Sequence, residues 1–245
     1  MRQVLTVALI LAASTALAVT GGHFDGVGGQ ANHDVSRAVV WSQMPQPAPS
    51  YYFASHYDAT GAWYAESADD FFFESVDPIT KVEWWGRYVE PSPPPYATSF
   101  IIRFYEDVPA GDPPYSHPGD VLYTGTVDMF TEEPAPEVGS AVFHYEAELM
   151  THAFLPAGHI YWISIQAGVF EDPDQWGWVK CVTEDEYMDE AVMISTPFGL
   201  PMWTPMSQLP RTPPFPHSEL AFVLHSEPGT PVEDATWGGI KAMFR

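Results

Sequence analysis

Hydrophobic and polar positions alternate along a series of short segments that begins near Tyr51. Side chains two residues apart point to the same face of a β-strand, so this period of two indicates strands with one apolar face. The apolar positions of successive segments are Val82, Trp84 and Tyr88; Phe100, Ile102 and Phe104; Val121, Tyr123 and Val127; Phe143, Tyr145, Ala147 and Leu149; Tyr161, Ile163 and Ile165; and Leu220, Phe222 and Leu224. No segment of this series sustains the 3.6-residue period of an amphipathic helix.

Turn residues rich in proline and glycine separate these segments. They gather at residues 91–95, 111–114, 118–120 and 156–158, and the chain's 25 prolines disfavour long helices. Many short strands with regular turn signals are typical of a β-sandwich. We therefore predict an all-β fold over residues 51–228, an antiparallel two-sheet sandwich of jelly-roll-like type.

The two ends of the chain have a different character. Residues 1–18 combine Arg2, an apolar run and a terminal Ala-Leu-Ala, which is the pattern of a cleaved signal peptide; an uncleaved N-terminal anchor is the alternative. Residues 19–50 are predicted to be a linker or N-terminal arm in which residues 39–41 add one edge strand. Residues 229–245 form a separate C-terminal tail. These features predict a secreted or cell-surface protein without stable membrane insertion after cleavage.

Composition narrows the range of partners. The 32 acidic residues against 9 basic ones give a net charge of −23, which repels nucleic acid and anionic lipid. Cys181 is the sole cysteine, so an intramolecular disulfide is excluded and the apolar core must stabilise the fold. In its strand context Cys181 is expected to be a small core residue rather than a nucleophile.

Several motifs together resemble a group of largely uncharacterised secreted β-sandwich modules of environmental bacteria. In chain order they are Ala-Asp-Asp-Phe at 68–71, Val-Glu-Trp-Trp-Gly-Arg-Tyr at 82–88, Phe-Ile-Ile-Arg-Phe-Tyr-Glu-Asp at 100–107, Pro-Gly at 118–119, Gly-His-Ile-Tyr-Trp-Ile-Ser-Ile at 158–165, Trp-Gly-Trp at 176–178 and Leu-Ala-Phe at 220–222. The resemblance covers about residues 55 to 226 and implies a secreted sandwich without an implied activity. Residues 236–245 are similar to short C-terminal sorting tags of exported bacterial proteins.

Aspartates near predicted turns suggest a metal site. Asp69 and Asp70 precede a strand, and Asp107, Asp112 and Asp120 follow the strand at residues 100–105. Calcium prefers carboxylate and carbonyl oxygens supplied by loops, so these five residues are candidate ligands of a calcium ion. The alternative is that they are solvated carboxylates of a very acidic chain.

Tryptophans suggest a second type of site, a flat surface for sugar rings. Trp84 and Trp85 are expected on opposite faces of one strand, which leaves Trp85 available to a ligand. Trp176 and Trp178 share a face and can present two rings side by side. Trp85, Trp176 and Trp178 are therefore the candidate ligand-binding residues, and packing into the core is the alternative.

Signals of catalysis are weak in this sequence. It has no Gly-x-Ser-x-Gly motif, no glycine-rich phosphate loop and no histidine pair at metal-binding spacing. Glu146 and Glu148 share a strand face about 6–7 Å apart, a spacing near that of an inverting glycosidase pair. We predict a non-enzymatic binding or structural module for a carbohydrate or surface polymer; a glycan hydrolase or lyase on a jelly-roll scaffold is the alternative.

Overall fold

The computed structural model describes residues 37–47, 51–58, 64–89, 97–169, 175–182 and 189–227. They belong to one compact unit, residues 35–245. The predicted signal peptide at 1–18, the start of the predicted arm and the predicted tail at 229–245 lie outside the described residues. In the described part of the chain, no helix has the length and apolar character needed to cross a membrane.

The first sheet has seven strands and is antiparallel throughout. Its strands are β1 (Ala38–Gln43), β2 (Tyr52–Ala54), β5 (Ile79–Tyr88), β8 (Thr131–Pro134), β9 (Val142–Ala153), β11 (Trp176–Val179) and β14 (Phe222–Ser226). Strand β5 is central: β9 pairs along one side of it, and β14 followed by β11 pairs along the other. Strands β1, β2 and β8 form the edges of this sheet.

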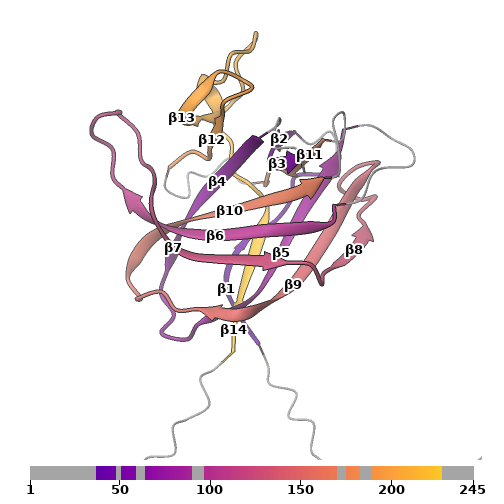
Figure 1. Cartoon of the computed structure of the whole chain (residues 1–245), viewed down its shortest axis with the longest axis vertical. Helices are drawn as coiled ribbons and strands as arrows, with labels where there is room; N and C mark the ends of the chain where they lie inside the picture. The colour runs from indigo at the N-terminus through magenta and orange to yellow at the C-terminus, as the bar shows by residue number, and fades with distance from the viewer. Residues whose placement is uncertain are drawn as a thin grey trace, which may run out of the picture. The chain divides into compact units, whose positions relative to one another are not determined.

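The second sheet also has seven strands (Figure 1). They are β3 (His56–Asp58), β4 (Tyr64–Phe73), β6 (Ser99–Val108), β7 (His117–Val127), β10 (His159–Val169), β12 (Val192–Ser195) and β13 (Leu200–Pro205), and a short 3₁₀ helix (Met206–Gln208) follows β13. The order is β13, β12, β4, β10, β6 and β7, with β3 inserted between the ends of β4 and β10. The β3–β10 pair is parallel and the other pairs are antiparallel.

The main hydrophobic core lies between the two sheets. Trp84 of β5 stacks on Tyr145 of β9 at a centroid distance of 5.5 Å and meets the edge of Phe100 of β6 at 4.9 Å. Ile102 and Phe104 are fully buried in this layer. Burial of each such side chain stabilises the fold by about 1.5–3 kcal/mol. The two-sheet sandwich predicted from the period of two is confirmed, and the jelly-roll connection pattern stays a prediction.

Smaller apolar clusters cover the outer face of each sheet. On the first sheet the cluster contains Trp85, Val179, Cys181 and Val223, closed over by residues 135–142. On the second sheet the members are Ala68, Tyr105, Trp162 and Val192. Strands β4, β10 and β11 are therefore buried on both faces, and the prediction that Cys181 is a core residue is confirmed.

Strand β1 extends the sandwich toward the N-terminus. Ala38 pairs with Ser226 and Gln43 with Phe222 along β14, so the edge strand expected at residues 39–41 is confirmed. The described fold thus begins before residue 51, where the sequence placed its start, because an isolated short strand offers too weak a period to be separated from a linker.

Candidate functional site

The tryptophans proposed as a sugar platform do not form one. Trp176 and Trp178 do share a face, as expected, but that face is the inner one and both side chains are fully buried. The indole Nε1 of Trp176 donates to the Tyr145 hydroxyl at 3.3 Å, and that of Trp178 donates to the Ala221 carbonyl at 2.8 Å. Neither ring is accessible to a ligand, because both indoles fill the space between the sheets.

Trp85 lies on the opposite face from Trp84, as the alternation predicted, and belongs to the outer cluster of the first sheet. Only 6% of its surface is exposed. The imidazole of His144 stacks on it at 4.6 Å with an interplanar angle of 19°. Trp85 therefore supports a neighbouring polar group and offers no flat ring to solvent.

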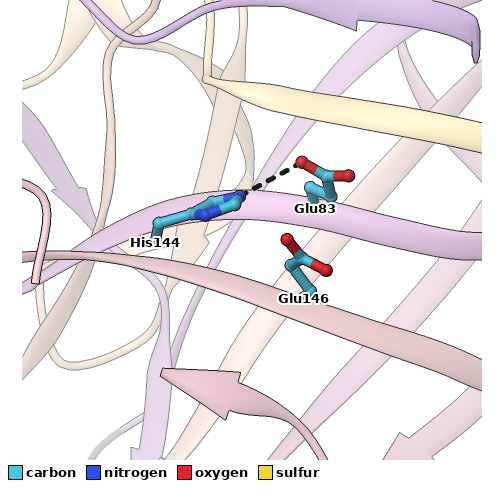
Figure 2. A group of neighbouring side chains, drawn as sticks. All are labelled: Glu83, His144 and Glu146. Carbon is cyan, nitrogen blue, oxygen red and sulfur yellow. Dashed lines mark hydrogen bonds and ion pairs between the residues drawn. The ribbon is translucent and has the colours of Figure 1, made fainter. Parts of the chain in front are cut away.

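A charged network occupies the same outer face. Strand pairing sets Glu83 of β5 opposite Glu146 of β9, with His144 one position further along β9 on this face. Figure 2 shows the three side chains pointing toward one another from the two strands. The Nε2 atom of His144 lies 3.2 Å from Glu83 Oε2, and Lys81 Nζ lies 3.0 Å from Glu83 Oε1 and 2.6 Å from Glu146 Oε2.

Positive partners on several sides stabilise the ionised form of Glu83. The hydrogen bond from His144, together with Lys81 and His225, lowers the pKa of Glu83 from 4.5 to about 2, against the opposing effect of burial. The Nε2 atom of His225 on β14 is 2.7 Å from Glu83 Oε1. Although Glu83, His144 and Glu146 are close enough to share a metal ion, the Lys81 ammonium already supplies a cation between the two glutamates.

A groove of about 610 Å³ opens beside this network. Lys81, Glu146 and Glu148 contribute its charged lining. Its apolar wall includes Met129 and Met150, whose exposed fractions are 84% and 90%. The remaining lining residues are Val127, Asp128, Phe130, Thr131 and Ala147. The groove therefore combines unusually exposed apolar side chains with hydrogen-bonding groups fixed on a sheet, the composition expected of a ligand site.

The two glutamates suggested as a catalytic pair both line this groove. Each is held by a cation: Glu146 by Lys81, and Glu148 by Arg37. Arg37 also pairs with Glu227 at 2.9 Å.

The five predicted calcium ligands are not brought together as a set. Asp69 and Asp70 are fully buried. Burial is the main cause of the raised pKa of Asp70, and the negative charge of Asp107 adds to it. Asp107 accepts a hydrogen bond from the indole of Trp162 at 2.9 Å. Asp112 and Asp120 are exposed, and neither belongs to a group of potential metal ligands in the described residues. The structure brings Asp69 and Asp70 of this set together and leaves Asp112 and Asp120 apart from them, and calcium binding stays a prediction.

A different acidic residue joins Asp69 and Asp70. Glu219, which precedes β14, lies with them in a fully buried group of three carboxyls. Sequence reasoning missed it because contact between β4 and the approach to β14 joins positions 151 residues apart. The exposed methionines of the groove were missed for the same reason, since no local period marks a residue that tertiary packing leaves uncovered.

The sequence of this sandwich matches a known protein family. Residues 39–225, from β1 to β14, match a domain of unknown function, DUF7901. No curated protein matches the chain at a significant level. Because the match covers most of the chain and nearly all of the described sandwich, the protein belongs to the DUF7901 family.

Proposed function

We propose that this protein is a non-enzymatic, extracytoplasmic binding module that holds a carbohydrate or surface polymer in the groove beside β9. The observation that carries the proposal is the groove itself, where Met129 and Met150 stand exposed next to a fixed array of charged side chains. The signal-like N-terminus and the strong negative charge support a location outside the cytoplasm.

The groove suits a polyhydroxylated ligand. Lys81 offers ammonium donors, while Glu146 and Glu148 offer acceptors, and all three lie on paired β-strands that keep their spacing. Sugar hydroxyls both donate and accept hydrogen bonds, and the apolar C–H faces of a sugar ring can pack on the methionine side chains. Rigid polar groups with an adjacent apolar wall give orientation and contact area together.

The ion pairs favour binding over hydrolysis. A glycoside hydrolase needs one carboxyl that stays protonated as a general acid. Lys81 forms an ion pair with Glu146 and Arg37 forms one with Glu148, so both glutamates of the groove are engaged by cations. This arrangement supports the use of Glu146 and Glu148 as hydrogen-bond acceptors for a ligand.

The test is a glycan array followed by titration of the best-bound glycan. Met129→Asp and Met150→Asp should each weaken binding by about tenfold or more, which corresponds to about 1.4 kcal/mol. Met202→Asp is the matched control, because Met202 is also exposed but lies on β13 of the other sheet. Binding should be unchanged in that control.

Two results would argue against the proposal. Failure of the wild-type protein to retain any glycan removes the ligand class, and binding that survives both groove substitutions removes the site. Release of reducing sugars by the wild type, with loss of that release in Glu146→Gln, supports the hydrolase alternative instead.

A further inference from the structure

Three buried carboxyls meet where β4 passes the start of β14. Asp69, Asp70 and Glu219 each have an exposed fraction of 0%, and one oxygen from each lies within 4.8 Å of the others. Among the described residues, His217 pairs with this group, its Nε2 lying 2.6 Å from Glu219 Oε1, and no lysine or arginine does so. Buried carboxyls without a compensating cation strongly disfavour ionisation.

Strand pairing explains why two consecutive residues of β4 reach the same place. Strand β12 pairs with β4 only as far as Ala68, so the next residues present an open edge on that side. There the backbone N–H of Leu220 donates to Asp69 Oδ2 at 2.6 Å, and the N–H of Asp189 donates to Asp70 Oδ2 at 3.2 Å. The segments leading into β14 and β12 thus converge on the two aspartates.

One oxygen in this group has no donor. Both oxygens of Asp69 have donors, since its Oδ1 accepts the Asp70 N–H at 3.2 Å and its Oδ2 accepts the Leu220 N–H. Glu219 Oε1 lies 2.6 Å from His217 Nε2. Glu219 also shares a side-chain hydrogen bond with Asp69. In contrast, Asp70 Oδ1 is inaccessible and accepts no hydrogen bond. Orphaned buried acceptors are rare, because each one forfeits its hydration without replacement.

We infer that Asp69, Asp70 and Glu219 bind a calcium ion. The orphaned Asp70 Oδ1 supplies a ligand atom that is already desolvated, and a divalent cation would bring positive charge to three buried carboxyls. Calcium fits this donor set because it takes six to eight oxygens in flexible geometry. Zinc is less suited, since it favours nitrogen and sulfur donors, and the nearest imidazole nitrogen, on His217, already contacts Glu219.

An acidic pocket lies beside these carboxyls. A pocket of about 300 Å³ is lined by Asp189, Glu190 and His217, among others. Two of these residues form hydrogen bonds with the buried group. The backbone N–H of Asp189 donates to Asp70, and the imidazole of His217 contacts Glu219. The pocket therefore places two acidic residues, Asp189 and Glu190, beside the segments that contact the buried group.

Electrostatics of the metal-free state agree with this geometry. Burial, followed by the charge of Glu219, raises the pKa of Asp69. Burial also raises the pKa of Asp70 and of Glu219 to about 9 each.

Calcium is expected to link the two sheets, because Asp69 and Asp70 belong to one and Glu219 leads into the other. The experiment is a thermal melt of the full chain, stripped with EDTA and then supplied with calcium, magnesium or zinc. At a calcium concentration about 100-fold above the dissociation constant, the midpoint should rise by about 5–10 °C. Equilibrium dialysis should find one high-affinity calcium ion per chain.

Asp70→Asn and Glu219→Gln should abolish the calcium shift while leaving the EDTA-treated midpoint no lower than that of the wild type. Each amide keeps the oxygen that accepts the present hydrogen bond and removes one buried acid. Asp112→Asn and Asp120→Asn are matched controls at exposed positions and should keep the full shift.

The inference is overturned if wild-type melts with EDTA and with calcium coincide, or if dialysis finds no bound calcium. It is equally overturned if Asp70→Asn and Glu219→Gln keep the full shift, or if zinc alone gives a response. Should a variant fail to fold, the dialysis stoichiometry of the wild type still decides, because it needs no substitution.

Discussion

Gly86 is the position at which packing around Trp176 can be tested most sharply. Gly86 lies on the inner face of β5, and a Cβ added there would overlap three atoms of the Trp176 indole ring. Neither partner can move freely. The strand is paired on both sides, with Phe143 and Trp178 opposite Gly86. The Trp176 indole donates a hydrogen bond to the Tyr145 hydroxyl, which fixes the ring. Gly86→Ala therefore forces strain into the centre of the sandwich.

The size of the effect follows from how little the site can relax. Overpacking a well-packed core lowers the free energy of unfolding by about 1–3 kcal/mol. Because the added Cβ overlaps a rigid ring and not a flexible chain end, Gly86→Ala is expected near the top of that range, at about 3 kcal/mol. For a domain of this size such a loss lowers the melting midpoint by about 6–12 °C. Urea unfolding followed by tryptophan fluorescence and by far-ultraviolet circular dichroism measures the change.

Two companion variants make the result specific. Gly111→Ala is the control, because a Cβ there comes no closer than 3.8 Å to another residue, and its stability should stay within about 0.5 kcal/mol of wild type. Combining Gly86→Ala with Trp176→Leu should cost less than the sum of the two single changes, since the smaller side chain removes the overlap. If Gly86→Ala is as stable as Gly111→Ala, the inward placement of Trp176 is wrong.

The remaining predictions concern buried and half-buried charges. Arg103→Met should destabilise the fold by about 3 kcal/mol in urea unfolding, because it removes the guanidinium 3.0 Å from the buried carboxylate of Glu66; an unchanged unfolding midpoint would show that the pair contributes nothing. The pKa of Glu83 is lowered from 4.5 to about 2 in the fold, so its interactions stabilise the protein above pH 4.5 and that contribution disappears as the pH falls toward 2. Glu83→Gln should flatten the dependence of stability on pH in this interval, and a profile identical to that of the wild type would contradict the assignment.

The sandwich was predictable because its central strands carry a period of two. Phe100, Ile102 and Phe104 occupy alternate positions of one strand, so they share a face, and all three are buried between the sheets. Strand β10 was harder, since Trp162 and Ser164 on its outer face are also buried. A second apolar layer outside a sheet leaves no period in the sequence, because both faces of the strand are then covered.

The sites were less predictable than the fold. Adjacent aspartates at 69 and 70 drew attention as metal ligands, but nothing near them in the sequence indicates Glu219. Trp176 and Trp178 were assigned to one face correctly, and whether that face points inward depends on the other sheet. Proximity in the chain predicts which residues share a strand face, whereas the chemistry of a site depends on contacts between distant segments.

The most direct test of the proposed binding function is amide chemical-shift mapping with the glycan that binds best on the array. The perturbed amides should lie in residues 127–131, 146–148 and 150, which line the groove, with residues of β13 unaffected. Shifts confined to the second sheet, or spread evenly over the protein, would contradict the assignment of the groove as the binding surface.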